Sequence, residues 1–300
     1  MSQSVDESSP AVPAIEFRHV SLGFEGRTVL DDVSFELPHG QMVIITGASN
    51  SGKSVLLHLA IGLLRPDEGE ILIEGNALNQ FGESELLALR GNTMGIAFQE
   101  DALFTGLSAF DNAAYRLVEH NWAEEDIDRS VREIMRFVGL EHDMEKLPEE
   151  LSIGMRRRLE IARALTGWPR IMLFDEPTSG LDPVNARLVL DLVIRARDLH
   201  NISILHATKE VHQIRYIAMH HASEDDKGEA AAASNTLPET QVMVLDQGKI
   251  VFLGSEADFE TSALPAVKQL TDPGAGEVIS QDTVEDPWPR TRKHILFGPE

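Results

Sequence analysis

The chain has 300 residues, enough for one large domain or two small ones, and its 42% hydrophobic and 25% charged residues are typical of a globular protein. Its 49 acidic residues against 26 basic ones give a formal net charge of −23, which argues against nucleic acid as a main partner and against binding an anionic membrane by charge alone. The lack of cysteine excludes disulfides, thiol catalysis and cysteine zinc sites, and it fits a reducing cytoplasm.

The N-terminal residues 1–14 contain no basic start and no apolar stretch, so they predict a flexible tail and not a signal peptide. No apolar run in the sequence approaches the roughly 20 residues that a membrane-spanning helix needs. Any role at a membrane is therefore expected to depend on a partner protein.

The first part of the sequence predicts strands and one buried helix. Alternating apolar and polar residues predict strands over 15–24, 28–37 and 69–74. A short apolar run at 42–46 enters a glycine-rich turn. The residues that follow, 55–64, are apolar almost all round, which is the pattern of a buried helix.

Further along, the pattern becomes helical, and Gly139 stands where a helix would end. Five apolar residues before it fall on one helical face: Ile127, Val131, Ile134, Met135 and Val138. A second buried strand at 171–174 is followed by a helix at 184–198 and a strand at 202–207. Two strand-to-helix units with helices between them predict an α/β fold with an inserted helical subdomain at about 100–165.

Two segments have the composition of poorly ordered chain. Residues 221–240 combine an acidic run, an alanine run and small polar residues, which predicts a flexible insertion. Residues 271–300 are rich in proline, glycine and charge and predict a tail, although Trp288 could anchor it. We therefore expect the folded domain to span residues 15–260, with a C-terminal extension at 261–300.

The glycine-rich turn has the pattern Gly-x-x-x-x-Gly-Lys-Ser. Its residues are Gly47, Ala48, Ser49, Asn50, Ser51, Gly52, Lys53 and Ser54. Glycines at both ends allow successive backbone amides to point inward and surround phosphate oxygens, and the N-terminus of the next helix adds its positive dipole end. Lys53 would contact the β- and γ-phosphates, and the Ser54 hydroxyl would ligate Mg²⁺. A chance glycine-rich turn is much less consistent with this strand–turn–helix order.

The second buried strand ends in Asp175 and Glu176. An aspartate at the end of a strand beside a phosphate loop holds Mg²⁺, and the next carboxylate can polarise an attacking water. Such a pair by itself is more often a feature of a turn. Its combination with the loop at 47–54 favours the catalytic interpretation.

The segment Leu151–Met155 precedes a basic run and a helix. Ser152 is a good helix N-cap, which is its simplest interpretation. The same geometry would also present the Ser152 hydroxyl and the Gly154 amide to an anion at the helix start. The segment Ser179–Asp182 follows the Asp-Glu pair.

This ordered set resembles the motifs of the ABC transporter ATPases over about residues 15–257. The corresponding motifs are Walker A at 47–54, the Q-loop at Gln99, the signature at 151–155, Walker B at 171–176 and the D-loop at 179–182. The resemblance implies a P-loop nucleoside-triphosphatase domain with an antiparallel β subdomain. It implies that Mg-ATP binds between two such subunits arranged head to tail. The Walker A loop of one chain would then face Ser152, Gly154 and the D-loop residue Asp182 of the other chain.

The same resemblance assigns individual roles. It implies that Phe24 stacks on adenine, that Gln99 reaches the Mg²⁺ shell and relays to a membrane subunit, and that Glu176 is the general base. It also implies integral membrane permease subunits as partners, a homodimer as the simplest assembly, and a cytoplasmic location on the inner face of the membrane through the permease.

A narrower resemblance links the chain to the ATPases of MCE-type (Mla) lipid transporters. The segments that carry it are 94–105, 110–115 and 147–157, and Met155 in place of the usual glutamine is typical of that branch. This similarity implies phospholipid as the cargo and an MCE-domain lipid-binding protein as a further partner. Other ABC importers share parts of the pattern, so another cargo is the alternative.

Two residues depart from the family pattern. Ile153 replaces the first glycine of the signature, and because a β-branched residue rarely holds positive φ, either the backbone is regular there or the loop has shifted. We favour the regular backbone, with the Ile153 side chain pointing outward, over an inactive signature. Lys209 falls at the position of the switch histidine. Side chains alternate along a strand, so His206 is expected in the core and Lys209 at the γ-phosphate. A charged lysine donates but cannot accept a hydrogen bond, which predicts slow hydrolysis with ATP binding retained.

The sequence thus favours the ATP-hydrolysing subunit of a transporter. A nucleotide-gated regulatory or scaffold protein with weak turnover is the alternative that Ile153 and Lys209 support. A soluble ABC protein of translation or DNA repair is disfavoured by the single cassette and by the acidic charge.

Overall fold

The computed structural model describes residues 12–98, 102–222 and 239–271, and their strands form two sheets. The smaller sheet is antiparallel, in the order β2 (Arg27–Leu37), β1 (Ile15–Phe24), β4 (Glu68–Ile73) and β5 (Asn76–Ala77). The larger sheet has the order β10 (Lys249–Ser255), β9 (Thr240–Asp246), β3 (Met42–Thr46), β8 (Ser203–Ala207), β7 (Ile171–Asp175) and β6 (Met94–Ala97). All neighbours in it are parallel except the hairpin of β9 and β10.

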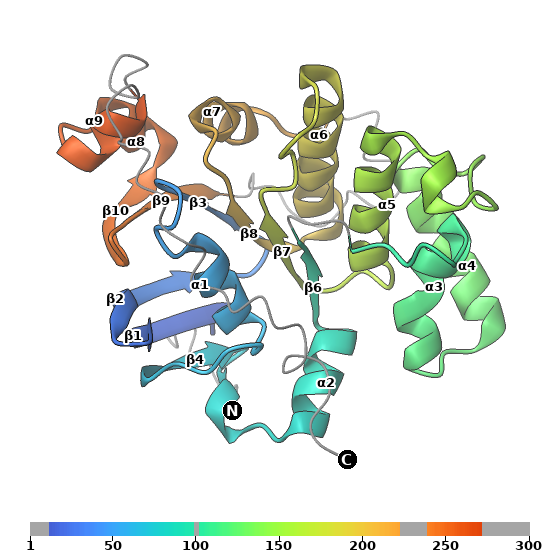
Figure 1. Ribbon diagram of the computed structural model, residues 1–300, viewed down its shortest axis with the longest axis horizontal. Helices are drawn as coiled ribbons and strands as arrows, with labels where there is room; N and C mark the ends of the chain where they lie inside the picture. The colour runs from blue at the N-terminus through green and yellow to red at the C-terminus, as the bar shows by residue number, and fades with distance from the viewer. Residues whose placement is uncertain (1–11, 99–101, 223–238, 272–300) are drawn as a thin grey trace, which may run out of the picture.

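The helices surround the larger sheet. They are α1 (Lys53–Ala60), α2 (Glu83–Asn92), α3 (Ala109–Glu119), α4 (Glu124–Phe137), α5 (Ile153–Leu165), α6 (Pro183–His200), α7 (Val211–Met219), α8 (Glu256–Thr261) and α9 (Pro265–Thr271), with 3-10 turns at Leu78–Gln80 and Pro148–Glu150. Figure 1 shows α1 between the two sheets and α3, α4 and α5 gathered at the side of the molecule opposite β10. The last group forms the predicted helical subdomain.

The central strands of the larger sheet are buried on both faces, and alternate residues serve two different cores. On β3, Val43 and Ile45 pack into a cluster with α1 and the antiparallel sheet. Met42 and Ile44 pack into a second cluster with α3, α4, α5 and α6. The uniformly apolar sequences of β3, β7 and β8 are therefore the consequence of a parallel sheet covered by structure on both sides.

The first helix is shorter than predicted. It ends at Ala60 and not near Leu64, because Gly62 adopts a positive φ of 70°. The Gly62 amide binds the Leu59 carbonyl and the Leu63 amide binds the His58 carbonyl, which is the Schellman arrangement that terminates helices. Apolar residues beyond that point pack as a turn, so an apolar run alone overestimated the helix.

The predicted end of α4 is correct. The apolar face carries Val131, Ile134 and Met135 as buried residues, and the helix ends at Phe137. Gly139 has a φ of 69°, and its amide binds the Arg136 carbonyl. The backbone here therefore needs the left-handed conformation that glycine adopts without steric cost.

The limits of the chain's ordered core differ slightly from those predicted. Ala14 is fully buried and its amide binds the Leu37 carbonyl, so the folded part begins before Ile15. At the other end, α8 and α9 continue past residue 260 and bury Phe259 and Val267. The predicted flexible insertion and tail fall mainly on residues outside the described ranges.

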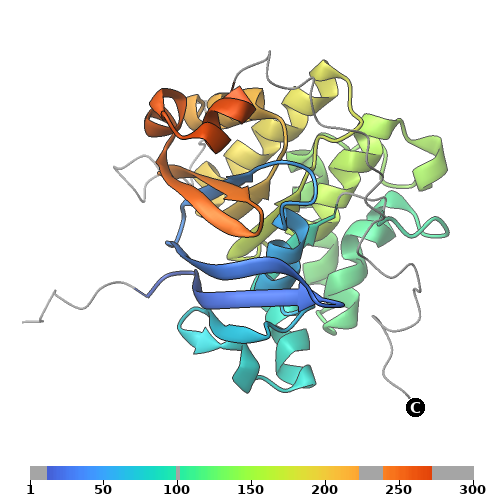
Figure 2. The ribbon, with the colours of Figure 1, turned by 60° about the vertical axis from the view of Figure 1, so that its left-hand side comes forward.

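The antiparallel sheet also packs against the larger sheet on the side where the loop at 47–54 lies. Figure 2 shows the β9–β10 hairpin lying over the β1–β2 hairpin, and the Asp31 amide of β2 binds the Gly248 carbonyl between β9 and β10 at 3.0 Å. Within the described ranges, no helix has both the length and the apolar character that crossing a membrane requires.

Candidate nucleotide-binding and hydrolysis site

The predicted catalytic segments meet at one edge of the larger sheet. Strands β3, β8 and β7 are adjacent and parallel, and Ala207 of β8 aligns with Ile45 of β3 and Asp175 of β7. Lys53 begins the helix that follows β3, Glu176 follows β7, and Lys209 follows β8. The carboxyl edge of a parallel sheet is where such folds bind their ligands.

The loop at 47–54 has the backbone of a phosphate-binding turn. Gly47 and Gly52 have φ angles of 149° and 104°, and a Cβ on Gly47 would lie 2.1 Å from the Leu245 carbonyl oxygen. The Lys53 side chain is 6% exposed, and its Nζ donates to the carbonyls of Gly47 and Ala48 at 3.0 and 2.9 Å. Burial lowers the pKa of Lys53, while the nearby Glu176 and Asp175 raise it. The ammonium is thus held by the carbonyls of its own loop.

Asp175 is 5% exposed at the end of β7, and its Oδ1 has no hydrogen-bond partner in the described part of the chain. Burial raises its pKa above the ordinary value, while a hydrogen bond with Ser54 and the charge of Lys53 counteract that rise. A buried carboxylate with an unsatisfied oxygen is costly unless it pairs with a cation. The donor set of Ser54 and Asp175 therefore fits Mg²⁺, a cation that prefers oxygen ligands.

Glu176 and Lys209 lie together. Lys209 Nζ is 3.3 Å from Glu176 Oε2, and their side chains are 45% and 14% exposed. Glu176 has a positive φ of 43°, and its amide binds the Ala207 carbonyl at 3.0 Å. A non-glycine residue in this region of φ is uncommon and is found where the surrounding structure holds it in place.

His206 lies in the core, as its strand position predicted. It is fully buried on β8, pairs in register with Phe174, and burial lowers its pKa to about 4. Within the described ranges, neither ring nitrogen has a hydrogen-bond partner. His206 therefore does not replace the switch histidine, and the residue that approaches Glu176 is Lys209.

The signature segment begins a helix. Ser152 is the N-cap of α5, and its hydroxyl accepts a hydrogen bond from the Met155 amide at 3.2 Å. Ile153 is the first helical residue and is 62% exposed, in agreement with the expected regular backbone and outward side chain. A Cβ on Gly154 would lie 2.1 Å from Asn185 Oδ1, so a larger residue there would force the Asn185 side chain to move.

Asp182 is the last residue of the predicted D-loop, 179–182, and it stands at the start of α6. It is the N-cap of α6 and accepts hydrogen bonds from the amides of Val184 and Asn185, and Asn185 Nδ2 donates to its second oxygen at 2.5 Å. These hydrogen bonds lower the pKa of Asp182. The starts of α5 and α6 are therefore in contact through Gly154 and Asn185. Sequence reasoning missed Asn185, because its importance comes from that contact and not from a motif.

Comparison with known protein families agrees with this geometry. The model of the ABC transporter family matches residues 30–179, half of the chain. A relative from Haemophilus influenzae, described as an intermembrane phospholipid transport system ATP-binding protein, MlaF, is 33% identical over 262 residues, which cover 85% of this chain and 97% of that protein. The chain belongs to the ABC transporter ATP-binding family.

Other relatives of this ABC protein differ in length and in name. A Mycobacterium leprae protein described as a probable ribonucleotide transport ATP-binding protein, mkl, is 38% identical over 71% of this chain. The match covers only 61% of that relative's length. Among solved structures, the dimeric ATP-binding cassette MJ0796, in a post-hydrolysis state bound to ADP and Pi, has a TM-score of 0.67 and 24% identity, with 80% of this chain and 98% of that chain covered. This similarity shows that the two chains share the same fold.

Gln99, the predicted Q-loop residue, lies outside the described residues, but both of its flanks are described. Arg157 of α5 donates to the Phe98 carbonyl at 3.0 Å, and Glu160 accepts from the Ala102 amide at 3.4 Å. Arg157 and Glu160 pair with each other at 2.6 Å and are 8% and 5% exposed. The helix that starts at the ABC signature therefore holds the chain on both sides of Gln99. Arg157 and Glu160 are three residues apart on a helix, and this spacing was a signal in the sequence that motif analysis did not use.

Phe24 ends β1 and is partly buried against the core that contains α1. This places it on the antiparallel sheet that packs against the nucleotide loop. Its predicted stacking on adenine stays a prediction.

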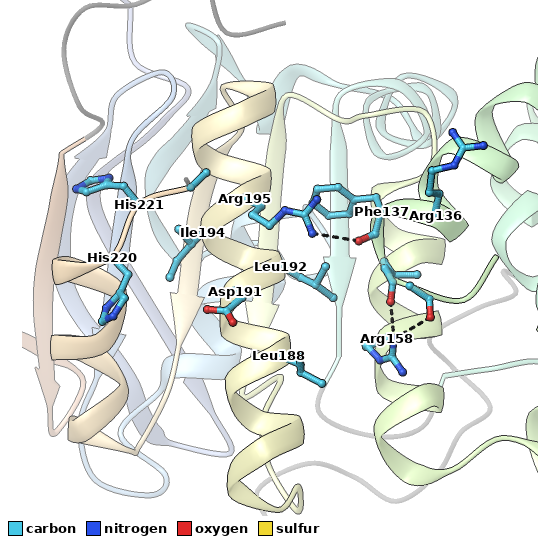
Figure 3. A pocket seen from close by; sticks show the side chains of 13 residues that line it. Arg136, Phe137, Arg158, Leu188, Asp191, Leu192, Ile194, Arg195, His220 and His221 are labelled. Carbon is cyan, nitrogen blue, oxygen red and sulfur yellow. Dashed lines mark hydrogen bonds between the residues drawn. The ribbon is translucent and has the colours of Figure 1, made fainter. Parts of the chain in front are cut away.

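Two pockets lie on either side of α6. One, of about 520 Å³, is lined by Glu176, Lys209, the D-loop residues 179–181 and α7, so it belongs to the ABC site. The other, of about 440 Å³, is shown in Figure 3. There Arg158 of α5 donates to the carbonyls of Val138 and Gly139, and Arg195 of α6 reaches the Phe137 carbonyl at 3.5 Å. Both arginines therefore bind carbonyls at or just beyond the C-terminus of α4, which attaches α4 to α5 and α6.

Proposed function

We propose that this chain binds and hydrolyses Mg-ATP as the motor subunit of an ABC transporter, and that the transporter moves phospholipid. The observation that carries the proposal is the carboxyl edge of the larger sheet, where Lys53, Glu176 and Lys209 follow three adjacent parallel strands. The assignment of phospholipid is supported by the MlaF relative, which matches over nearly its full length, whereas the mkl relative matches over 61% of its length.

Each side chain at the edge has a role in hydrolysis. The amides of 47–52 and the Lys53 ammonium hold the phosphates, since both are donors at a helix N-terminus. Ser54 and Asp175, with Gln99, would hold Mg²⁺, which when bound neutralises phosphate charge. Glu176 accepts a proton from the attacking water as general base. Lys209 donates to the γ-phosphate after it leaves the Glu176 carboxylate.

The site needs a second copy to be complete. Ser152, Gly154 and Asp182 lie at the starts of α5 and α6, and we assign them to the nucleotide held by a partner chain's Walker A loop. Closure of this homodimer on ATP and its reopening after hydrolysis would drive permease subunits in the membrane. The chain would then sit on the cytoplasmic face of the membrane through the permease, with an MCE-domain protein as a further component.

A second candidate function is supported by one observation. The Lys209–Glu176 ion pair neutralises the carboxylate that hydrolysis requires. A nucleotide-gated scaffold that dimerises on ATP and turns over very slowly is consistent with that contact. Measured turnover separates the two functions, because the scaffold would show ATP-driven dimerisation with no hydrolysis in the complete membrane complex.

The cargo is tested in proteoliposomes that contain the complex purified with this chain. We expect ATP-dependent transfer of a fluorescent phospholipid between membranes, abolished by Lys53→Ala. Mass spectrometry of the complex should recover a permease and an MCE-domain protein. Uptake of a labelled ribonucleotide without phospholipid transfer would overturn the assignment of cargo while leaving the motor role in place.

A further inference from the structure

Gln213 is a buried polar side chain that no motif includes. It is the third residue of α7, is 3% exposed, and lies between two buried threonines. Its Nε2 donates to Thr178 Oγ1 at 2.9 Å, and its Oε1 accepts from Thr208 Oγ1 at 3.1 Å. Thr178 and Thr208 are 6% and 1% exposed. Both ends of the Gln213 amide are therefore satisfied by hydroxyls on two different loops.

The two loops are those that carry Glu176 and Lys209. Thr178 stands two residues after Glu176, and the Ser179 amide turns back to the Glu176 carbonyl at 3.0 Å. Thr208 stands immediately before Lys209, and its hydroxyl also accepts a hydrogen bond from the Glu210 amide at 3.1 Å. The single side chain of Gln213 thus bridges the turn after β7 and the turn after β8.

Backbone hydrogen bonds hold the ends of β7 and β8, but they do not hold the side chains of Glu176 and Lys209, which follow these strands. The Glu176 amide is bound to the Ala207 carbonyl, and the Thr208 amide is bound to the Ile45 carbonyl. Beyond these points the chain leaves the sheet ladder. Glu176 then takes a positive φ of 43°, a conformation that persists only when neighbouring groups hold it.

We propose that Gln213 is a positioning residue for ATP hydrolysis, one that sets the separation of Glu176 and Lys209 without touching the nucleotide. The proposal rests on the roles given to those two residues in the proposed function. When the nucleotide draws Lys209 toward the γ-phosphate, the Gln213 bridge transmits that movement to the turn that carries Glu176 and leads into the D-loop. The hydrolysis rate, and not ATP affinity, is the quantity that the bridge controls.

The test replaces Gln213 with leucine, which keeps the volume and removes both hydrogen bonds. We expect kcat for ATP to fall by about tenfold or more in the full chain in its membrane complex, because small misplacements of catalytic groups are costly, with the Kd for a non-hydrolysable ATP analogue within about twofold. Gln213→Glu keeps the acceptor for Thr208 and should restore part of the rate. Gln269→Leu, an exposed glutamine on α9, is the matched control and should leave the rate unchanged.

A double-mutant comparison separates positioning from simple stability. In a Lys209→Ala background, Gln213→Leu should lower kcat much less than in the wild type, since the group it positions is gone. Additive effects, or a loss of kcat that only follows a loss of thermal stability or of ATP binding, would overturn the proposal. If Gln213→Leu does not fold, Thr208→Val removes one bond of the bridge and must show the same selective loss of kcat. Absence of ATP turnover in the wild-type membrane complex would refute the proposed function itself, a separate outcome.

Discussion

Lys209 Nζ lies 3.3 Å from Glu176 Oε2, so the cation at the switch position is paired with the carboxylate assigned as general base. The lysine side chain is nearly half exposed, and an ion pair of that exposure contributes only about 0–1 kcal/mol. The contact is therefore weak enough for a phosphate to displace.

Replacing Lys209 with histidine should raise ATP turnover several-fold. A neutral imidazole can accept as well as donate a hydrogen bond, and it releases Glu176 from the ion pair. Steady-state ATPase assays at saturating ATP measure this effect, with Lys209→Ala as the variant that removes the pair without supplying an imidazole. If turnover of Lys209→His fell below that of the wild type, the lysine would be an adapted catalytic residue.

His206 should make the fold sensitive to acid. Its folded-state pKa of about 4 lies below the ordinary value of 6.5, so the unfolded chain takes up a proton that the folded chain refuses. Stability is therefore lost as the pH falls below about 6.5, by about 2 kcal/mol between pH 7.5 and pH 5, and the loss levels off below about pH 4. Urea unfolding of wild type and His206→Leu at both pH values measures this difference.

The leucine variant should lack this part of the acid sensitivity. It also removes two ring nitrogens that have no hydrogen-bond partner within the described ranges. Equal losses of unfolding free energy in the two proteins between the two pH values would show that other groups cause the acid sensitivity.

Removing Arg157 should destabilise the chain strongly. Arg157→Met leaves the Glu160 carboxylate buried without its guanidinium, which typically costs about 3–5 kcal/mol of unfolding free energy. Arg132→Met, which breaks an exposed pair with Asp128 on α4, is the control and should cost less than about 1 kcal/mol. The double variant Arg157→Met, Glu160→Met should recover much of the loss. Similar small effects of Arg157→Met and Arg132→Met would refute the role of the buried pair.

The parts of the site that follow strands could be predicted from sequence. The loop at 47–54, Asp175 and Glu176 were predicted from local motifs that follow strands, and the parity argument correctly put His206 in the core and Lys209 beside Glu176. The role of Gln99 cannot be compared in the same way, because that residue lies outside the described ranges. The assigned roles at the site stay predictions.

Most of the contacts that sequence reasoning missed are long-range. Gln213 meets Thr178, which is 35 residues away, and Arg157 meets Phe98, which is 59 residues away. Nothing in the local pattern of α7 distinguishes Gln213 from a solvent-facing glutamine. The early end of α1 was missed for a different reason, because Gly62 stops the helix through its backbone conformation while the apolar pattern continues.

The most direct test of hydrolysis at this site compares ATP turnover by the wild type and by Glu176→Gln in the complete membrane complex with Mg²⁺ present. Glutamine keeps the size of the side chain and removes the proton acceptor, so turnover should fall by about 10²-fold or more while the Kd for ATP stays within about twofold. Turnover by Glu176→Gln at the wild-type rate would contradict the assignment of Glu176 as the general base, and absence of turnover in the wild-type complex would contradict the proposed motor.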